Sequence, residues 1–440
     1  MDKFLERNVM QELIKWKNSP RRKPLILRGA RQVGKTEVLK EFGKREYKDI
    51  AYFSFDQNEP LKDVFRKTKQ IDRVIDDLTF LNKSSINKGT TLIIFDEIQE
   101  CGEALNTLKY FCEDEPEYHI ACAGSLLGVR MAKTSFPVGK VNFINVYPMT
   151  FTEFLKATDH SNLVAYMDNI KEVEPIPEIF TSQLEENLKY YLVIGGMPEA
   201  VKTWIEYKDI NMVEEAIKEI LVAYDLDFSK HTSVPEANKI NLIWKSVPSQ
   251  LSRENKKFLY QVVKEGARAR EYEDALNWLD NADIIKKVYL ATANKLPLTS
   301  YEDLSSFKIY SNDVGLLRHK SELDSSIVIE GNRIFEEFKG ALTENYVLQM
   351  MIAKNQTIPK YYTFDKYEID FLHQYKNDIL PVEVKSGLGK NANSLKRYNE
   401  EYNPKLRIRF STNNLKQDDN LINIPLFMVE YLDRIIEIVK

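Results

Sequence analysis

The segment Leu25–Thr36, LILRGARQVGKT, constrains the fold of this chain more than any other. A short apolar run leads into Gly29-x4-Gly34-Lys35-Thr36, and a helix-forming segment follows. This is the order of strand, loop and helix that a phosphate-binding P-loop requires. The two glycines allow the backbone N–H groups to face one point, and the following helix directs its positive end at the same anion. The segment predicts a nucleotide-binding α/β domain; the alternative is a glycine-containing surface turn that matches by chance.

Residues of this loop have separate expected roles. Lys35 is expected to reach the β- and γ-phosphates of ATP, and the Thr36 hydroxyl is expected to ligate Mg²⁺. The predicted nucleotide-binding residues are Gly29, Ala30, Arg31, Gln32, Val33, Gly34, Lys35 and Thr36. ATP and Mg²⁺ are therefore the predicted cofactors.

A second apolar strand, within Thr91–Glu100 (TLIIFDEIQE), ends in two acids, Asp96 and Glu97. Four consecutive apolar residues are typical of a buried strand, and α/β sheets place their ligands at the carboxyl ends of such strands. Downstream of a P-loop, Asp96 is expected to hold Mg²⁺ directly or through water. Glu97 is expected to orient and deprotonate the attacking water. On its own, the pattern is equally typical of an ordinary strand end.

Three further residues are candidates for the same site. Ser125 ends the next predicted core strand, 118–125, where its hydroxyl can sense the γ-phosphate; the alternative is a small residue that permits a tight turn. Arg31 and Arg130 can stabilise transition-state charge in the same or a neighbouring subunit, so a homo-oligomer is one of the expected states. Both are equally compatible with ordinary surface arginines.

Composition limits the remaining classes. A chain of 440 residues exceeds one core, so roughly two to four domains are expected. Because 62 basic residues nearly balance 66 acidic ones, the total charge indicates neither a nucleic-acid nor a membrane partner, and any such surface must be local. Three cysteines without paired spacing disfavour a zinc site or a disulfide framework. The N-terminus lacks the apolar core of a signal peptide, and no apolar run reaches about 18 residues. We expect a cytoplasmic protein with no membrane contact.

Helical periodicity dominates after Thr152, and Gly195-Gly196 interrupts it. Pro198 is suited to begin the next helix, so the segment predicts a hinge between two helices. A hinge beside a nucleotide can report the state of that nucleotide.

Together these motifs resemble those of AAA-type ATP-binding proteins that carry a carboxyl-terminal domain of unknown function 4143. The resemblance covers nearly the whole chain and rests on residues 29–36, 95–99, 136–141, 147–149, 195–199, 227–231 and 381–387. It implies an AAA+ core with a helical lid, a winged-helix segment and a carboxyl-terminal domain similar to restriction-endonuclease-like folds. Gly196-Met197-Pro198 looks like the Gly-x-Pro element that packs near the adenine in STAND-like ATPases. Gly196 and Pro198 therefore join the expected nucleotide-binding residues.

The middle of the chain also fits a winged helix-turn-helix. Helical pattern from Ala237 to Arg270 and from Tyr272 to Ala282 leads into predicted strands at 284–290 and 307–310. Between Arg253 and Arg270 the sequence is mostly basic. It contains six basic residues, Arg253, Lys256, Lys257, Lys264, Arg268 and Arg270, and two acidic ones, Glu254 and Glu265. Such a module can place a helix in the DNA major groove and contact phosphates with its basic face, so DNA is an expected partner. The alternative is a solvated helix face on a module that contacts proteins.

The last segment carries a third motif. Glu383 and Lys385 are two residues apart, so they project from the same face of a predicted strand, and Asp370 lies on the preceding strand, where it can lie across from them. PD-(D/E)xK nucleases use this spacing to hold a divalent ion between two carboxylates, with the lysine supporting the hydrolytic water. Asp370 and Glu383 are the predicted metal ligands, and Glu344, on a predicted helix, can add a carboxylate. The alternatives are a fold that binds nucleic acid without cutting it, and a simple surface ion pair.

The predicted organisation is an α/β P-loop AAA+ core (1–155), a helical lid (156–232), a winged helix (233–320) and a PD-(D/E)xK nuclease-like α/β domain (321–440). The first hypothesis is an ATP-hydrolysing AAA+ protein whose nucleotide state positions the last two domains on DNA. Its predicted catalytic residues are Lys35, Glu97, Ser125, Asp370, Glu383 and Lys385, with Thr36, Asp96, Asp370 and Glu383 as metal ligands. The second hypothesis is a STAND-like nucleotide switch whose carboxyl-terminal domain binds protein or nucleic acid but is catalytically inert.

Overall fold

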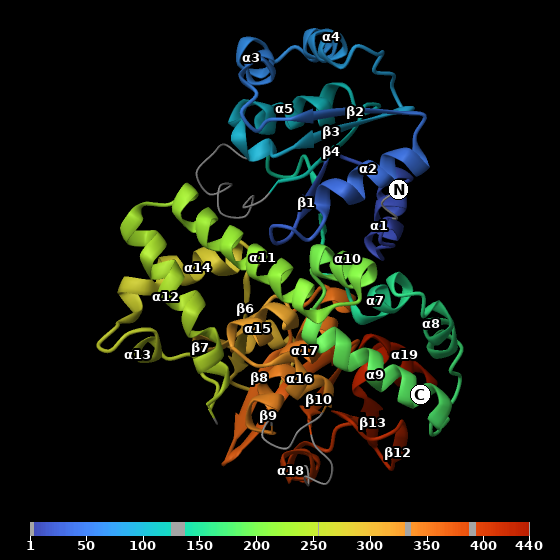
Figure 1. Cartoon of the computed structure of the whole chain (residues 1–440), viewed down its shortest axis with the longest axis vertical. Helices are drawn as coiled ribbons and strands as arrows, with labels where there is room; N and C mark the ends of the chain where they lie inside the picture. The colour runs from blue at the N-terminus through green and yellow to red at the C-terminus, as the bar shows by residue number, and fades with distance from the viewer. Residues whose placement is uncertain (1–3, 125–136, 254, 331–335, 387–392, 440) are drawn as a thin grey trace. The chain divides into compact units, whose positions relative to one another are not determined.

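The computed structural model describes residues 4–124, 137–253, 255–330, 336–386 and 393–439 (Figure 1). The chain forms two compact units. The first comprises Met1–Tyr147 with Asn281–Asp283, and the second comprises Pro148–Asp280 with Ile284–Lys440.

The first unit is built on a five-stranded parallel sheet in the order β2-β3-β4-β1-β5. Its strands are β1 (Leu25–Arg28), β2 (Asp49–Ser54), β3 (Thr91–Asp96), β4 (His119–Cys122) and β5 (Asn142–Asn145). β4 separates the strand that leads into the P-loop from the strand that ends in Asp96. A parallel order with helical crossovers brings the carboxyl ends of these strands to one edge, as the sequence predicted for an α/β domain.

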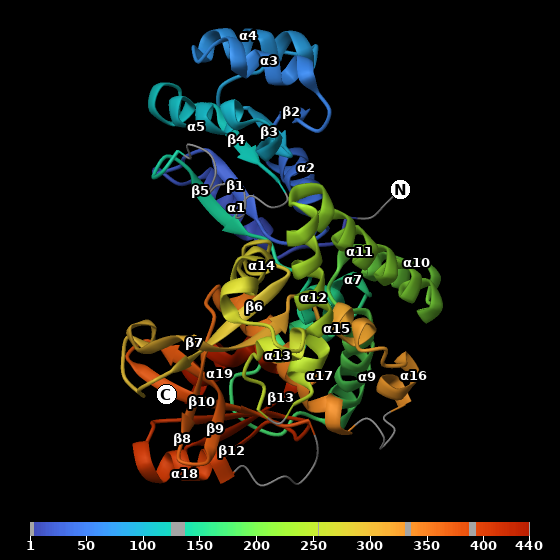
Figure 2. The ribbon, with the colours of Figure 1, turned by 90° about the vertical axis from the view of Figure 1, so that its left-hand side faces the viewer.

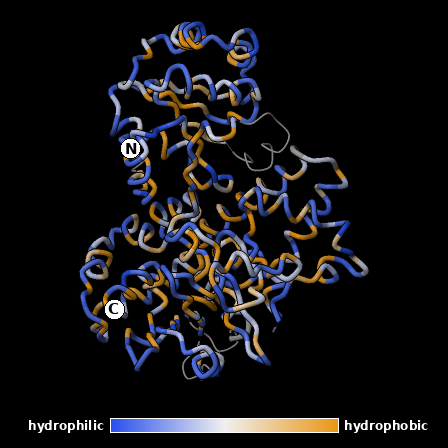
Figure 3. The backbone as a smooth tube through the Cα atoms, turned by 180° about the vertical axis from the view of Figure 1, so that it is seen from behind, coloured by the Kyte–Doolittle hydropathy of each residue, from blue (hydrophilic) through white to orange (hydrophobic). Residues whose placement is uncertain are grey.

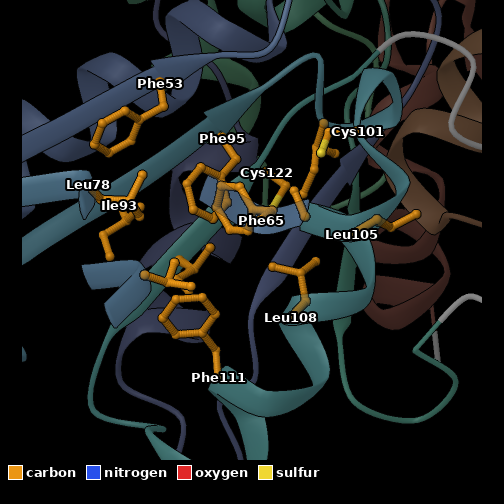
Figure 4. Packing of buried hydrophobic residues seen from close by; sticks show 14 of the residues in the cluster. Phe53, Phe65, Leu78, Ile93, Phe95, Cys101, Leu105, Leu108, Phe111 and Cys122 are labelled. Atoms are coloured by element: carbon orange, nitrogen blue, oxygen red, sulfur yellow. The ribbon is translucent and has the colours of Figure 1, made fainter. Parts of the chain in front are cut away.

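Helices cover this sheet: α1 (Val9–Lys17), α2 (Lys35–Glu46), α3 (Glu59–Lys67), α4 (Ile71–Asn82) and α5 (Gly102–Asp114). Asn58 caps α3 by accepting a hydrogen bond from the Leu61 N–H at 3.2 Å. Part of the core lies between the sheet, α3, α4 and α5 and includes Phe65 and Phe95 (Figure 4). The ring of Phe95 contacts those of Phe55 and Phe65 at centroid distances of 5.6 Å each. Because Phe95 is fully buried, Phe95→Ala should lower the free energy of unfolding by about 3–5 kcal/mol.

The second unit begins with helices. They are α7 (Phe151–Ala157), α8 (Ser161–Asp168), α9 (Glu178–Ile194), α10 (Pro198–Tyr207), α11 (Ile210–His231), α12 (Val234–Leu251), α13 (Tyr260–Val263) and α14 (Ala269–Asn281). β5 ends at Asn145, and Thr150 caps α7. The Thr150 hydroxyl and the Glu153 carboxylate form a reciprocal capping box, which favours a helix start at this position. The helix break predicted at Gly195-Gly196 is confirmed, since α9 ends at Ile194 and α10 begins at Pro198. Its action as a hinge stays a prediction.

An eight-stranded sheet completes the second unit, in the order β12-β13-β11-β10-β9-β8-β6-β7. Its strands are β6 (Ile285–Ala291), β7 (Glu302–Ser311), β8 (Lys360–Phe364), β9 (Tyr367–Tyr375), β10 (Asp378–Val384), β11 (Arg407–Ser411), β12 (Lys416–Asp418) and β13 (Leu421–Pro425). Four helices accompany them: α15 (Val314–Lys320), α16 (Ser325–Glu330), α17 (Glu336–Asn355) and α18 (Asn393–Tyr402), and α19 (Leu432–Val439) follows. β8, β9 and β10, which lie side by side in Figure 2, form an antiparallel meander. β11 then pairs with β10 in parallel.

The two strands predicted for a winged-helix ribbon do pair with each other, but they also belong to this larger sheet. β6 and β7 are antiparallel, and β6 lies parallel to β8 through Leu290 opposite Tyr361 and Ala291 opposite Tyr362. A two-stranded ribbon alone is marginally stable, and pairing with β8 satisfies one of its open edges. The segments predicted as separate domains after residue 155 therefore share one compact unit.

Apolar and polar stretches alternate along the tube in Figure 3. Within the described ranges, no helix combines the length and the apolar character needed to cross a membrane.

Candidate functional sites

The P-loop connects the end of β1 to the start of α2 in the first unit. Its backbone takes left-handed conformations at Gln32 and Gly34, with φ of 64° and 89°, and Gly29 has φ of 141°. A Cβ atom at Gly29 would lie 2.0 Å from the Val146 carbonyl oxygen, so only glycine fits there. The sequence requires this tight turn, and the turn sets the N-terminus of α2 beside the loop.

Lys35 is folded back onto this loop. Its ammonium donates to the carbonyl oxygens of Gly29 at 2.8 Å and Ala30 at 2.7 Å, and the side chain is buried. Burial lowers the pKa of Lys35 to about 8, because the charged form loses hydration, although nearby Glu97 and Asp96 oppose this shift. Phosphate oxygens are stronger acceptors for this ammonium than the two carbonyls.

The structure brings Thr36 and Asp96 together, as the sequence predicted. The Thr36 hydroxyl lies 3.0 and 3.1 Å from the two carboxylate oxygens of Asp96. The Glu97 N–H donates to Asp96 Oδ1 at 3.1 Å, and the Tyr52 hydroxyl donates to Asp96 Oδ2 at 2.7 Å. A hydroxyl and a carboxylate side by side, next to the P-loop, supply oxygen ligands of the kind that Mg²⁺ prefers.

Glu97 follows β3 with a left-handed backbone, φ 51°, and begins the short 3-10 helix Ile98–Glu100. Non-glycine residues rarely take this conformation, so the chain holds the side chain at a strained turn. Gln99 donates a hydrogen bond to the Glu97 carboxylate. These contacts orient the acid that the sequence predicted to act on water.

Two residues of this site escaped the sequence analysis. Arg7 is buried and donates to the Val33 carbonyl at 2.9 Å and to the Tyr147 carbonyl at 2.6 Å, so it ties the P-loop to the chain after β5. Tyr52 comes from β2, the neighbour of β3, and burial together with the hydrogen bond to Asp96 raises the pKa of its hydroxyl. Strand alternation in 50–55 could have identified Tyr52 as a residue beside β3, but nothing local marks Arg7.

The other predicted nucleotide contacts have different outcomes. Ser125 and Arg130 lie outside the described residues, and Arg31 is half-buried in the loop. Gly196 lies in the second unit, where its N–H donates to Asp313 at 2.7 Å and a Cβ would lie 2.1 Å from the Met149 carbonyl oxygen. The structure gives this glycine a packing role, and adenine contact by Gly196 and Pro198 stays a prediction.

The second candidate site is an acidic cluster in the second unit, formed by Glu344 of α17, Glu368 and Asp370 of β9, and Glu383 of β10. The Val384 N–H donates to Asp370 Oδ2 at 2.7 Å, which places Asp370 beside the strand that carries Glu383. Lys385, directly after β10, forms an ion pair with Glu383. The structure therefore brings together the three residues of the predicted Asp…Glu-x-Lys motif.

Two further lysines and a tyrosine contact this acidic cluster. Lys308 of β7 is fully buried and lies 2.6 Å from Glu368 and 3.8 Å from Glu344. Tyr310, on the same strand, donates to Glu344, and Lys256 forms an ion pair with Glu344. The position of Lys308 between Phe307 and Ile309, in an otherwise apolar strand, could have marked it as a buried lysine. Its partners could not be predicted from the sequence of β7 alone.

Burial and the neighbouring charges together shift the pKa values of the groups in the acidic cluster. Burial raises the pKa of Asp370 well above its usual value, and the neighbouring acids Glu344 and Glu383 add to the rise. Burial also acts to raise the pKa of Glu344, but Lys256 and Lys308 overcome it, so this pKa is lowered. For Lys308 the desolvation effect would lower the pKa, yet Glu344 and Glu368 raise it.

One carboxylate oxygen of the acidic cluster is unsatisfied. Glu383 Oε2 is buried and has no hydrogen-bond partner within the part of the chain that the structure describes. In that same part, no group of three or more His, Cys, Asp or Glu side chains converges as metal ligands would. The unsatisfied oxygen could accept a cation. The other carboxylates, however, already form ion pairs with Lys256, Lys308 and Lys385. The metal assignment of Asp370 and Glu383 stays a prediction.

Comparison with known proteins gives three family matches. Residues 21–155 match the AAA domain, residues 185–326 match a domain of unknown function (DUF8612) and residues 339–427 match a domain of unknown function (DUF4143). The match at 21–155, together with the P-loop and the Thr36–Asp96 pair, identifies an AAA-type P-loop ATPase domain. The carboxyl-terminal DUF4143 domain expected from the sequence is confirmed.

Individual relatives are distant. An uncharacterized protein of Methanocaldococcus jannaschii is 25% identical over 248 residues, and the chain spans about half the length of this curated relative, 50% of each. The Walker-type ATPase PABY2304 of Pyrococcus abyssi is 14% identical with a TM-score of 0.46, over 72% of this chain and 96% of that one. The Aeropyrum pernix Orc1 protein, solved in complex with DNA, is 11% identical with a TM-score of 0.31, over 73% and 94%.

Proposed function

We propose that this chain binds and hydrolyses ATP with Mg²⁺ at the P-loop of its first unit. The observation that carries the proposal is the contact between the Thr36 hydroxyl and the Asp96 carboxylate at 3.0 Å, beside a loop whose backbone is shaped for phosphate. Bound Mg²⁺ would supply charge stabilisation on the phosphate oxygens. Thr36 and Asp96 are the residues that fit it.

Different residues of the first unit would have different roles in hydrolysis. Lys35 leaves the Gly29 and Ala30 carbonyls and donates to the phosphates, where its charge offsets the charge that develops in the transition state. Glu97, held by its strained turn and by Gln99, orients the attacking water and accepts its proton. Arg7 keeps the loop in place through the Val33 carbonyl.

Lys35→Ala tests this proposal. The variant should lose ATP binding or turnover, measured by calorimetry and by phosphate release. Lys44→Ala is the matched control, because Lys44 lies on the same helix with its side chain 69% exposed. A normal rate in Lys35→Ala would overturn the assignment.

We further propose that the second unit carries a nuclease-like domain that binds DNA. Two observations support the proposal of a restriction-endonuclease-like core. One is the order α17, β8–β9–β10 meander, α18, and β11 parallel to β10; the other is the proximity of Asp370, Glu383 and Lys385 to one another. Lys264, Arg268 and Arg270 are exposed near α13 and α14 and supply basic groups for phosphate contact. Lys256 does not, because it pairs with Glu344 instead.

An inert carboxyl-terminal domain on a nucleotide switch is the second candidate. The ion pairs that fill the acidic cluster favour it, since a metal-dependent nuclease needs those carboxylates for the ion. Two measurements separate the candidates: cleavage of DNA with Mg²⁺ or Mn²⁺, and ATP turnover with and without double-stranded DNA. Cleavage that Glu383→Ala abolishes supports the nuclease, whereas slow turnover that is indifferent to DNA supports the switch.

A further inference from the structure

The chain passes from the first unit to the second within a short segment, residues 146–149, called here the crossing segment. Its first half supports the P-loop. The Val146 N–H donates to the Arg28 carbonyl at 2.7 Å, and the Val146 carbonyl oxygen is the atom that leaves room only for glycine at Gly29. The Tyr147 carbonyl accepts from Arg7, the residue that also holds the loop. A shift of the crossing segment would therefore be felt by the loop.

The second half of the crossing segment is held in the second unit. Met149 is fully buried, and both of its backbone polar groups are hydrogen-bonded. Its N–H donates to the Gly196 carbonyl at 2.6 Å, and its carbonyl accepts from the Tyr191 hydroxyl. The backbones pack closely here, because a Cβ atom at Gly196 would lie 2.1 Å from the Met149 carbonyl oxygen. The second unit thus fixes the position of this residue.

The ring of Tyr191 is fixed by its neighbours. It contacts the rings of Phe151, Phe154 and Tyr346 edge to face, at centroid distances of 5.7, 5.5 and 5.8 Å. Tyr191 itself is fully buried. Aromatic pairs of this kind hold a ring independently of its hydroxyl. A phenylalanine at this position should therefore keep the packing and lose only the bond to Met149.

The hydroxyl of Tyr191 is held as a hydrogen-bond donor. Gln349 of α17 donates to it at 3.1 Å, which leaves the hydroxyl proton for the Met149 carbonyl. Burial raises the pKa of Tyr191 well above its usual value, and the nearby carboxylate of Asp313 adds to the rise. The hydroxyl therefore stays protonated over the whole range in which the protein would work.

The two anchored ends of the crossing segment are separated by one residue, Pro148. Proline fixes its own φ near −65° and restricts the residue before it, so this connection has little freedom to bend. The Tyr147 carbonyl is held by Arg7 on one side of the proline, and both backbone groups of Met149 are held on the other. A displacement at Met149 is therefore passed along the backbone to Tyr147 and Val146 rather than absorbed.

We propose that Tyr191 is a positioning residue for the reaction at the P-loop: it holds Met149, and through the crossing segment it keeps the loop in the shape that accepts phosphate. The inference rests on the proposed binding of ATP at this loop. The metal and water residues come from α2, β3 and the turn after β3, outside the crossing segment. ATP affinity should therefore depend on Tyr191 more than the maximal turnover rate does.

Tyr191→Phe in the full chain tests the proposal. It should weaken binding of a non-hydrolysable ATP analogue with Mg²⁺ by about 3- to 10-fold, the effect of one lost hydrogen bond, because ATP must then select the competent loop from a broader set. Turnover at saturating ATP should stay within about twofold of the wild-type rate. Calorimetry and phosphate release measure the two quantities.

Tyr346→Phe is the matched control. Tyr346 is also a buried tyrosine of the second unit, and its hydroxyl donates to a backbone carbonyl, that of Leu426 at 3.2 Å. Both variants lose one such bond, so a purely structural role predicts the same affinity in the two. Equal affinities for the ATP analogue in Tyr191→Phe and Tyr346→Phe would overturn the proposal.

A second measurement uses the wild-type chain and covers the case in which Tyr191→Phe does not fold. Amide-resolved hydrogen exchange should slow at the Met149 N–H by about threefold or more when the ATP analogue and Mg²⁺ saturate the P-loop, since coupling between two sites is reciprocal. The Ser311 N–H, which donates to Asn345 at 2.8 Å in the same unit, should not change. An unchanged rate at Met149 would contradict the proposal.

The outcomes also separate this inference from the proposed function. A wild-type chain that binds no ATP analogue would remove the proposed function, and the inference with it. Binding by the wild type that Tyr191→Phe leaves unchanged would retain the proposed function and remove the positioning role of Tyr191.

Discussion

The two candidate sites stabilise their buried charged groups in different ways. At the P-loop, backbone geometry defines the site, and the one buried ammonium, Lys35, satisfies its hydrogen bonds with the loop's own carbonyls. In the acidic cluster, side chains from α17, β7, β9, β10 and segment 255–259 neutralise one another. A site made of backbone can accept an anion with little rearrangement, whereas a site made of paired side chains must break ion pairs before it accepts a cation.

The largest effect expected from this comparison is on ATP turnover. Glu97→Gln should lower turnover by about 100- to 10,000-fold with ATP affinity retained, because the amide cannot accept the proton of the attacking water while the backbone cradle is unchanged. Phosphate release and calorimetric ATP binding check both parts. Glu117→Gln, a side chain 71% exposed in the same unit, is the control. Turnover at the wild-type rate in Glu97→Gln would remove the assigned role.

The second-largest expected effect is on the free energy of unfolding, through the buried ion pairs of the acidic cluster. Lys308→Met should lower the free energy of unfolding by about 3–5 kcal/mol, because it leaves Glu368 and Glu344 without a buried counter-charge. Urea denaturation followed by tryptophan fluorescence gives the value. Lys366→Met, at the exposed turn between β8 and β9, should change it by less than about 0.5 kcal/mol. A loss below about 1 kcal/mol in Lys308→Met would show that the acids are not held by ion pairing.

The smallest expected effect is on the metal requirement of the P-loop site. Tyr52→Phe should raise the Mg²⁺ concentration needed for half-maximal turnover by about tenfold, since the Asp96 carboxylate loses the hydrogen bond that orients it. The turnover rate at saturating Mg²⁺ should change little. A lower saturated rate with an unchanged Mg²⁺ requirement would place Tyr52 outside metal positioning.

Local patterns predicted much of what the structure contains. The P-loop turn, the buried strand before Asp96 and the helix break at Gly195-Gly196 follow from glycine, proline and apolar spacing, which act within a few residues. The juxtaposition of Asp370 with Glu383 followed from strand alternation and a hairpin connection. Helix α18 and strands β12 and β13 escaped detection. In α18 most residues are polar and two, Leu395 and Tyr398, are buried, and β12 has exposed residues along its whole length.

Contacts between segments that are distant in the sequence decided the remaining features of the fold and of the sites. The sequence alone determined that a nucleotide-type loop and an Asp…Glu-x-Lys motif exist, since each depends on a backbone or strand geometry set by neighbouring residues. Only the tertiary structure decided that β6 joins β8, that Arg7 holds the P-loop, and that Lys256 turns inward to Glu344 rather than outward to DNA. A lysine has no local preference that distinguishes a phosphate in solvent from a buried carboxylate, so the packing of distant elements selects its partner.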